Sequence, residues 1–215
     1  MTTSSRRVGA ETSKTRDALL DCVEKMMLEE GYPSVTYRAL ATKAGVTPSL
    51  VQYYFPSLDD IFVAAIKRYS ERGLKYLTEA LERRADDPLR AVWDYSREEA
   101  TGALITEFMA LGNHRESVRT EIAAVTKSVR RMQLDALVAK YGKDARPIGD
   151  LSLPALQLLM SGLPKFLNLE KGIGVKSGHD EVTKAFERYI GSVEPRADPP
   201  KRKSSTRRRA TTRTR

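Results

Sequence analysis

Hydroxyl and amide side chains gather in one short polar stretch of the chain. The stretch contains Thr47, Ser49, Gln52, Tyr53 and Tyr54. A glutamine amide can bond adenine through two hydrogen bonds in the major groove, and serine, threonine and tyrosine commonly bond phosphate oxygens. Residues 31–57 contain two bases, Arg38 and Lys43, and no acid, which suits a surface that faces phosphates. The pattern indicates DNA binding, and a helical hairpin with a polar face is the alternative interpretation.

Side chains suited to catalysis or metal binding form no recognisable site in the sequence. The chain has one cysteine, Cys22, which cannot form an internal disulfide, and two histidines without partners at metal-ligand spacing. Residues 172–177, GIGVKS, lack the adjacent Gly-Lys-Ser of a phosphate-binding loop and follow a predicted helix instead of a strand. No Ser/His/Asp, Cys/His or paired-carboxylate pattern is found. We therefore expect neither an enzyme nor a bound metal or cofactor.

Two short helices are predicted to position the polar stretch. The first covers residues 38–44 and is broken by Gly45, which supplies the permissive backbone of a tight turn. The second follows Thr47-Pro48, a cap and then a proline in the first turn, and ends at Phe55-Pro56. Four apolar side chains can form a small core between the two helices: Leu40, Ala44, Val46 and Val51. This arrangement is that of a helix-turn-helix.

The rest of the body is predicted to be helical, because its apolar residues recur at three-four spacing and no long alternating strand pattern occurs. The first helix is expected to start near Thr12 or Ser13 and to stop before Gly31. Further helices are expected over residues 58–83, from Asp87-Pro88 with an interruption at Gly102, and over 118–136, 152–169 and 179–193. Residues 152–169 are apolar on two faces, so both faces must be covered. The fold class is therefore all-α.

Both ends of the chain are polar. Residues 1–11 are expected to form a flexible arm. Residues 196–215 contain nine bases and one acid, so nearly all of the net charge of +9 belongs to this tail and the body is close to neutral. Because the tail has almost nothing apolar to bury, it is expected to be disordered. We interpret it first as a source of sequence-independent DNA affinity; binding of acidic lipid or protein, and solubility alone, are the alternatives.

The segment from Lys14 to Arg68 resembles the N-terminal domain of the TetR (tetracycline-repressor-like) family of bacterial transcriptional regulators. The matching residues are Gly31-Tyr32, Val35-Thr36, Leu40-Ala41, Ala44-Gly45-Val46-Thr47, Tyr53-Tyr54-Phe55-Pro56-Ser57 and Ile61-Phe62. The resemblance implies a three-helix DNA-binding domain on a larger helical domain for ligand binding and dimerisation. The expected division is an arm at 1–11, a helix-turn-helix domain at 12–57, a helical domain at 58–195 and a basic tail at 196–215.

The same resemblance assigns DNA contacts to residues of the two short helices. They are Thr36, Tyr37, Arg38, Thr47, Pro48, Ser49, Gln52, Tyr53 and Tyr54. The first three resemble the phosphate-facing end of the family's second helix, and the next three lie where its recognition helix enters the groove. Gln52 takes a position often held by tyrosine and is expected to read a base, whereas Tyr53 and Tyr54 resemble a pair that contacts the DNA backbone. Leu58 departs from the family, since relatives often carry a lysine there that approaches a phosphate.

The second domain is expected to dimerise and to hold a ligand. The resemblance places dimerisation on the last two body helices, through Leu156, Leu159, Leu163, Phe186 and Tyr189; the alternative is that both helices complete the core of their own subunit. The candidate pocket residues are Trp93, Phe108, Met109, Met160 and Phe166, each of which could instead be plain core. The ligand is expected to be largely apolar, because no cluster of charges suggests a clamp. Pro164 is expected to kink its helix.

These observations predict a homodimeric, ligand-responsive regulator in a bacterial cytoplasm. It is expected to bind a palindromic operator in double-stranded DNA, with recognition helices about 34–36 Å apart, and to leave it when a small apolar effector binds. Repression, as opposed to activation, is a tendency of the family. The main alternative is an architectural DNA-binding protein that depends on its basic tail and has no ligand switch. A ligand sensor without DNA binding is a third possibility; no membrane partner is expected.

Overall fold

The computed structural model describes residues 3–195, and within them the side chains of residues 14–98 and 103–195. The regular structure of this part is entirely helical, which confirms the predicted fold class. Its elements are α1 (Thr3–Glu30), the 3₁₀ turn η1 (Tyr32–Ser34), α2 (Tyr37–Ala44), α3 (Pro48–Tyr54), α4 (Leu58–Arg83), α5 (Pro88–Arg97), α6 (Glu99–Gly112), α7 (Glu116–Tyr141), α8 (Leu153–Gly172) and α9 (His179–Val193). None of these helices is long and apolar enough to cross a membrane. The predicted basic tail lies outside the described residues.

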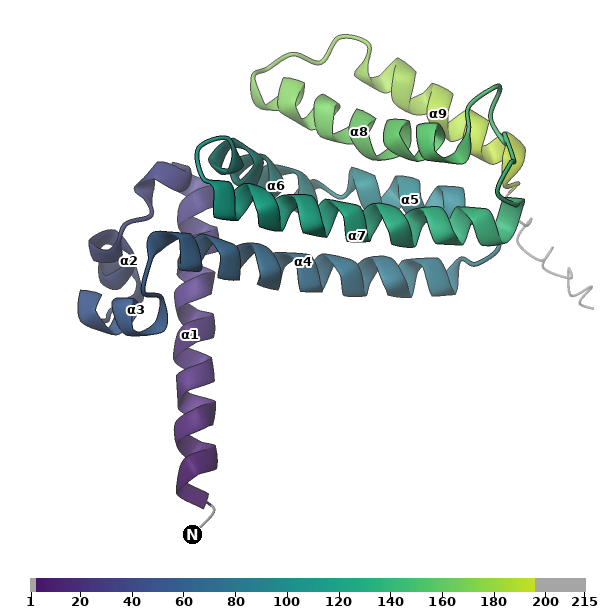
Figure 1. Ribbon diagram of the computed structural model, residues 1–215. Coiled ribbons are helices and arrows are strands. Elements are labelled where there is room, and N and C mark those ends of the chain that lie inside the picture. Colours follow the sequence, from purple (N-terminus) through teal and green to yellow (C-terminus); the bar gives the residue numbers. More distant parts are fainter. Residues whose placement is uncertain (1–2, 196–215) are drawn as a thin grey trace, which may run out of the picture.

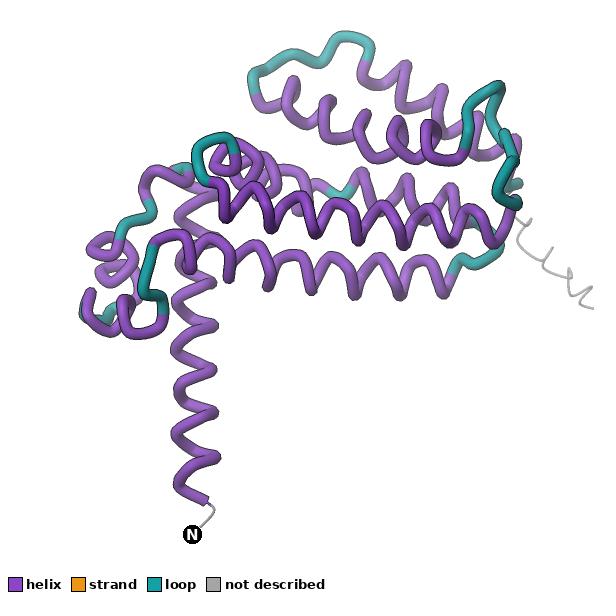
Figure 2. The backbone as a smooth tube through the Cα atoms, in the orientation of Figure 1, coloured by secondary structure: helices purple, strands orange, loops and turns teal. Residues whose placement is uncertain are grey.

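The helices form two groups that share the long helix α4. Helices α2 and α3 lie beside α1, which crosses one end of α4 and extends its N-terminal turns away from the body (Figure 1). Helices α4 and α7 run side by side, and α8 packs against α5 and α7 on the side of α7 away from α4. Most connections between helices are short, and longer loops join α7 to α8 (residues 142–152) and α8 to α9 (residues 173–178) (Figure 2). The smaller group therefore sits at one end of the larger one.

Two helix boundaries differ from those predicted. The first helix begins at Thr3, so Thr12 and Ser13 lie inside it and most of the expected arm is helical backbone. A cap-forming side chain favours a helix start without requiring one, and no proline interrupts this stretch. Likewise, α6 continues through Gly102, and the break falls at Glu98, between α5 and α6. A glycine inside a helix costs only about 1 kcal/mol relative to alanine, which the rest of the helix offsets.

Two apolar cores hold the body together. The first joins buried residues of α1 to α4 with Leu104, Phe108 and Leu111 of α6 and Val118 of α7. The second joins the far end of α4 to helices α5, α7, α8 and α9. Since the first core includes residues from both sides of Ser57, the predicted domain boundary there does not separate two cores. The small group of helices is anchored on α6 and α7 as well as on α4.

Helix α8 is covered on one of its two apolar faces. Leu156 and Met160 are buried in the second core. Pro164 is also buried, and the helix continues through it. Large apolar side chains on other faces of the same helix are exposed: Leu158, Leu159, Phe166 and Leu169. The expectation that both faces must be covered is therefore met for one face within the subunit.

The end of α9 is fixed by a buried carboxylate. Glu194 accepts hydrogen bonds from the backbone N–H groups of Leu89 (2.8 Å) and Arg90 (2.9 Å), at the start of α5. Its Oε1 also accepts a hydrogen bond from the Tyr141 hydroxyl at 2.5 Å. Burial, followed by the hydrogen bond to the Glu194 carboxylate, raises the pKa of Tyr141 above its ordinary value. The carboxylate thus supplies the cap that the N-terminus of α5 otherwise lacks.

Replacing Tyr141 by phenylalanine is expected to lower the free energy of unfolding by about 1.5 kcal/mol, the usual value for losing one hydrogen bond to a charged group. Chemical denaturation followed by circular dichroism measures this change. Tyr76→Phe is the matched control: Tyr76 is exposed and stacks on Tyr95, so its loss of a hydroxyl should cost under about 0.5 kcal/mol. Equal effects of the two substitutions would contradict the role given to Tyr141.

Candidate nucleic-acid interface and ligand cavity

The two short helices are built by local signals. The Thr36 hydroxyl oxygen accepts a hydrogen bond from Ala39 N (3.2 Å) and caps α2. Gly45 ends that helix in the left-handed region, at φ +68°, where a side chain would be strained. Thr47 caps α3 through a hydrogen bond from Leu50 N (3.4 Å). Leu40 and Val51 are buried between the two helices, and the predicted helix-turn-helix is confirmed.

Most of the predicted DNA contacts lie on the exposed side of this unit. The exposed ones are Thr36, Arg38, Thr47, Pro48, Ser49, Gln52 and Tyr53, and Tyr54 is half-buried. The Thr36 hydroxyl oxygen accepts a backbone hydrogen bond, so its proton can still be donated to a phosphate. The Thr47 hydroxyl oxygen accepts one as well and lies 3.0 Å from Ser49 Oγ, so one of these two hydroxyls donates to the other and the second keeps its proton for a phosphate. The rings of Tyr53 and Tyr54 meet edge to face at 5.3 Å between centroids, which fixes their relative orientation.

Tyr37 has a different position from the other predicted contacts. Its hydroxyl donates a hydrogen bond to the carbonyl oxygen of Phe55 at 3.0 Å, and the side chain is half-buried. Burial, with a smaller effect from the Asp60 carboxylate, raises the pKa of this phenol. The hydrogen bond joins the start of α2 to the end of α3. Tyr37 therefore holds the two helices together, and its hydroxyl is already used within the protein.

The prediction of an acid-free basic surface is wrong at Lys43. The ammonium nitrogen lies 3.0 Å from Glu29 Oε2 and 3.0 Å from Glu30 Oε1, and these carboxylates raise its pKa, Glu30 most strongly. Both acids lie at the end of α1, just before residues 31–57, and the turn after α1 places α2 next to them. The charge of Lys43 is thus neutralised. Arg38, the other base of residues 31–57, has no ion-pair partner among the described residues.

Arg16 is a basic residue near the interface that the sequence reasoning missed. It is an exposed residue of α1, and its guanidinium carbon lies 5.2 Å from the centroid of the Phe55 ring, at the end of α3. A guanidinium stacked on an aromatic face keeps its N–H donors available to other partners. The position of Arg16 depends on how α1 crosses α3, so no pattern within either helix points to it.

The larger group of helices contains a cavity of about 300 Å³ between α4, α5, α6, α7 and α8. Of the predicted pocket residues, only Met109 lines it. Phe108 and Met160 are fully buried in the first and second core, respectively. Trp93 is buried, stacks on Phe186 with centroids 5.1 Å apart and borders a smaller groove, and Phe166 is exposed. The largest side chains fill cores and surface, as buried aromatic residues usually do.

The cavity wall also contradicts the expectation that no charges cluster there. Arg130 of α7 and Lys165 of α8 both line it, together with Gln133 of α7. The two cations are far apart in the sequence and meet because α7 and α8 pack together. Apolar side chains, among them Ile105 and Val129, form other parts of the wall.

The residues predicted for a dimer interface divide into two groups. Leu156 is a correction, because it is fully buried in the second core of its own subunit. Leu163 and Phe186 are partly buried against the same core. Leu159 and Tyr189 are exposed and are available for contact with a second copy. The apolar spacing of a helix does not tell which of its faces meets its own core.

Residues 19–85 match the family model described as "Bacterial regulatory proteins, tetR family". The chain is 28% identical over 175 residues to the HTH-type transcriptional repressor BepR of Brucella suis biovar 1 (strain 1330). The match covers 76% of this chain and 83% of BepR. Residues 19–85 therefore form a TetR-family domain. The prediction that the chain is a transcriptional regulator and not an enzyme is confirmed by these relatives.

Solved structures agree with a TetR-family fold over most of the chain. A TetR transcription regulator from Haloarcula marismortui ATCC 43049 matches with a TM-score of 0.64 and 14% identity, over 84% of this chain and 98% of that one. The multidrug binding protein EbrR, complexed with imidazole, matches with a TM-score of 0.57 and 20% identity, over 81% of this chain and 94% of that one.

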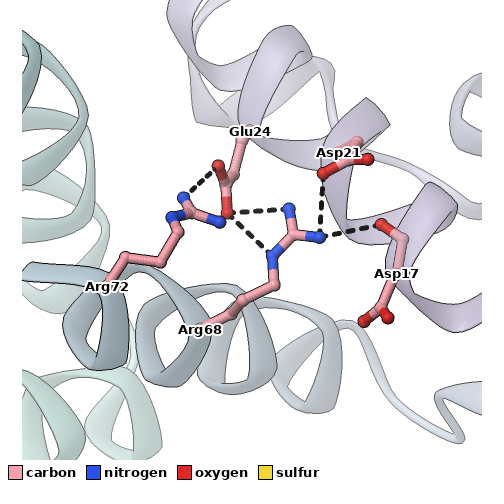
Figure 3. Close-up of polar contacts among 5 residues, drawn as sticks. All are labelled: Asp17, Asp21, Glu24, Arg68 and Arg72. Carbon is pink, nitrogen blue, oxygen red and sulfur yellow. Dashed lines mark hydrogen bonds and ion pairs between the residues drawn. The ribbon is translucent and has the colours of Figure 1, made fainter. Parts of the chain in front are cut away.

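A charged network joins α1 of the TetR-family domain to α4 (Figure 3). Arg68 donates hydrogen bonds to Glu24 Oε1 from Nε (3.1 Å) and Nη2 (2.8 Å). It also donates to the Asp17 carbonyl oxygen (2.8 Å) and pairs with Asp21 (2.9 Å). Arg72, one turn further along α4, pairs with Glu24 Oε2 at 2.6 Å. The network holds α1, which contributes to the first core, against α4, which borders the cavity.

Proposed function

We propose that this protein is a transcriptional repressor that binds a palindromic operator as a homodimer and is released by a small molecule. The observation that carries the proposal is the exposed polar face of α3, where Thr47, Ser49, Gln52 and Tyr53 point away from the buried Val51. Gln52 would read a base, and the hydroxyl groups would bond phosphates. Arg16 and Arg38 would add phosphate contacts from α1 and α2. A bacterial cytoplasm is the location that this role requires.

The homodimer is supported by the uncovered apolar face of α8. Leu159 is 44% exposed and Phe166 is 56% exposed, and Tyr189 of α9 adds a third large exposed side chain. Apolar patches of this kind mark interfaces more often than free surface. A two-fold contact between α8 and α9 of two copies would bury them and place two recognition helices on one side of the DNA.

Ligand response is supported by the position of the cavity relative to the DNA-binding helices. On α6, Ile105 and Met109 line the cavity, while Phe108 lies in the first core. Glu107 of the same helix accepts a hydrogen bond from Tyr32 N at 3.0 Å, in the turn that leads to α2. A ligand that moves α6 or α4 would therefore move the helix-turn-helix. The related fold of EbrR, which is complexed with imidazole, is consistent with a small-molecule site.

The division at Ser57 remains part of the proposal, with residues 12–57 reading DNA and residues 58–195 binding ligand and partner. The capping box formed by Ser57 and Asp60 begins α4 at that point. The competing function, architectural DNA binding through the basic tail, predicts affinity without sequence preference. A measurement of DNA sequence preference therefore distinguishes the two functions.

Selection of binding sites from random duplex DNA by the full chain tests the proposal. Enrichment of a palindrome with two half-sites is the expected result. Gln52→Ala is expected to relax the preference at one base pair of each half-site and to cost about 1–3 kcal/mol for each lost base contact. Ser128→Ala, an exposed change on α7 whose hydroxyl bonds only within its helix at Ala124, is the control and should select the same palindrome with the same affinity.

Two results would contradict this function. If a folded, full-length chain enriched no motif, sequence-specific operator binding would be excluded. If Gln52→Ala selected the same bases with unchanged affinity, Gln52 would not read DNA. A chain lacking residues 196–215 separates the contribution of the tail, because the proposal expects it to select the same site.

A further inference from the structure

The cavity wall contains a buried amide donor without a partner. Gln133 is 1% exposed and lines the cavity. Gln157 Nε2 donates to the Arg130 carbonyl oxygen (2.6 Å) and to Gln133 Oε1 (3.1 Å). Because a carbonyl oxygen can only accept, the Gln157 amide nitrogen must face Arg130, and Gln133 must present its oxygen to it. The Gln133 Nε2 is then left without a hydrogen-bond acceptor among the described residues, which is unfavourable for a buried amide.

Two positive charges face the same cavity. Lys165 and Arg130 line it, and among the side chains that the structure describes no aspartate or glutamate lines it. Among the described residues, neither cation has an ion-pair partner. Both residues are also open to solvent; desolvation of the Lys165 ammonium, followed by the like charge of Arg130, lowers the pKa of Lys165. Two like charges on one cavity wall repel each other, so an anion between them would be attracted by both.

The remaining wall is mostly apolar. Ile105, Val125, Val129 and Leu158 line the cavity from three helices. Its volume of about 300 Å³ lies at the lower end of the range for small-molecule sites. The phenols of Tyr69 and Tyr95 also line it, and burial raises the pKa of both, so they stay neutral. The site thus combines hydrogen-bond donors and positive charge at one part of the wall with a body of apolar surface.

We infer that this cavity binds an amphipathic organic anion, whose carboxylate lies between Arg130 and Lys165 and whose apolar body contacts α6 and α7. The inference rests on the proposed function in one respect, since it names the effector class of that regulator. Gln133 Nε2 would donate to the same carboxylate or to a polar group next to it. The expected effector, a largely apolar molecule without a charged group to clamp, is thereby given an acidic head.

Binding of the anion would also change how α7 and α8 pack. Arg130 belongs to α7 and Lys165 to α8, and their like charges repel while the cavity lacks an anion. A carboxylate between them would draw the two helices together. Since α8 carries the exposed apolar face described above, this movement would alter the spacing of two subunits. The effector would thus act through the dimer.

Isothermal titration of the full chain with decanoate and with 4-phenylbutyrate tests the inference. At least one of these carboxylates is expected to bind, and decan-1-ol and decyltrimethylammonium are expected to bind at least tenfold more weakly. Lys165→Met and Arg130→Met should each weaken carboxylate binding by about 10- to 100-fold. Lys127→Met is the matched control on α7, because Lys127 is exposed and does not line the cavity; it should leave the affinity unchanged.

Thermal unfolding supplies a second readout. Lys165→Met is expected to keep or raise the unfolding temperature of the protein without ligand, since it removes a repelled charge, and to abolish the increase that the carboxylate produces in the parent chain. Failure of both carboxylates to bind, equal binding of the alcohol, or unchanged affinity in Lys165→Met and Arg130→Met would overturn the inference. Carboxylate binding that leaves operator affinity unchanged would instead uphold this site and reject the proposed ligand-controlled repression.

Discussion

Leu159→Glu is expected to convert the protein from a dimer to a monomer and to weaken operator binding by about 10²- to 10⁴-fold, the usual advantage of two linked binding modules. Leu159 lies on the exposed face of α8, with Phe166 about two turns further along the same helix. In a two-fold contact the substitution would bring two carboxylates into one apolar interface, where each loses its hydration without gaining a partner. A single helix-turn-helix would remain, and it would bind one half-site.

Sedimentation equilibrium of the parent chain and the variant measures the oligomeric state, and titration of the selected palindrome measures the affinity. Leu28→Glu is the matched control, since Leu28 is also an exposed leucine, on α1, and should leave the dimer intact. Circular dichroism must show unchanged helix content in both variants. A Leu159→Glu protein that stayed dimeric would move the interface away from this face of α8.

The helix-turn-helix could be predicted from the sequence because its determinants are local. The caps Thr36 and Thr47, the left-handed Gly45 and the buried Leu40 and Val51 all lie within one short segment. Each signal acts within a few residues of its effect, so the pattern in the sequence and the contacts in space coincide. The family resemblance rests on the same segment for that reason.

Features that depend on packing between distant helices could not be predicted in this way. The sequence of residues 31–57 predicts that Lys43 is unpaired, but the turn after α1 places Glu29 and Glu30 next to it. The cavity has walls from five helices, and its charges come from Arg130 and Lys165 on two of them, so no sequence window contains them. Large apolar side chains did not predict the position of the cavity, because a cavity forms where such side chains are absent.

Helix α8 shows the intermediate case. Its sequence predicts apolar residues on two faces but does not assign the faces. The structure buries Leu156 in the core of the subunit and leaves Leu159 exposed. The difference depends on how α8 rotates about its axis when it packs on α5 and α7. Residues three apart are neighbours on a helix surface, so Leu156 and Leu159 lie on either side of the border between the packed and the exposed surface.

Arg68→Met is expected to lower the free energy of unfolding by about 3 kcal/mol and to weaken the effect of the ligand on DNA binding. Arg68 is 17% exposed in its side chain and Glu24 is 15% exposed. Removing one member of a buried ion pair costs about 3–5 kcal/mol, and the remaining exposure and the second partner, Arg72, place this pair at the low end. The methionine keeps the apolar contacts of the arginine stem but not its four polar contacts.

The loss of ligand response follows from the position of Arg68 on α4. The next residue, Tyr69, lines the cavity and contacts the ring of Phe108, at 5.9 Å between centroids. One turn of α4 therefore borders the ligand site and holds α1. Without the guanidinium, movement of α4 would be passed to α1 less completely, so the ratio of operator affinities with and without ligand should fall toward one. The affinity of the cavity for ligand in the absence of DNA should change little.

Lys67→Met is the matched control, because Lys67 is the neighbouring residue on α4 and forms an exposed pair with Glu121 at 3.7 Å. Exposed pairs contribute under about 1 kcal/mol, so this variant should keep both stability and ligand response. A double-mutant cycle of Arg68→Met with Glu24→Met should give a coupling energy of about 1–3 kcal/mol. If Arg68→Met instead lost stability and kept the full ligand response, the network of α1 and α4 would support the fold alone. The signal would then have to pass through α6, where Glu107 holds the Tyr32 backbone, or through the α8 face of the dimer.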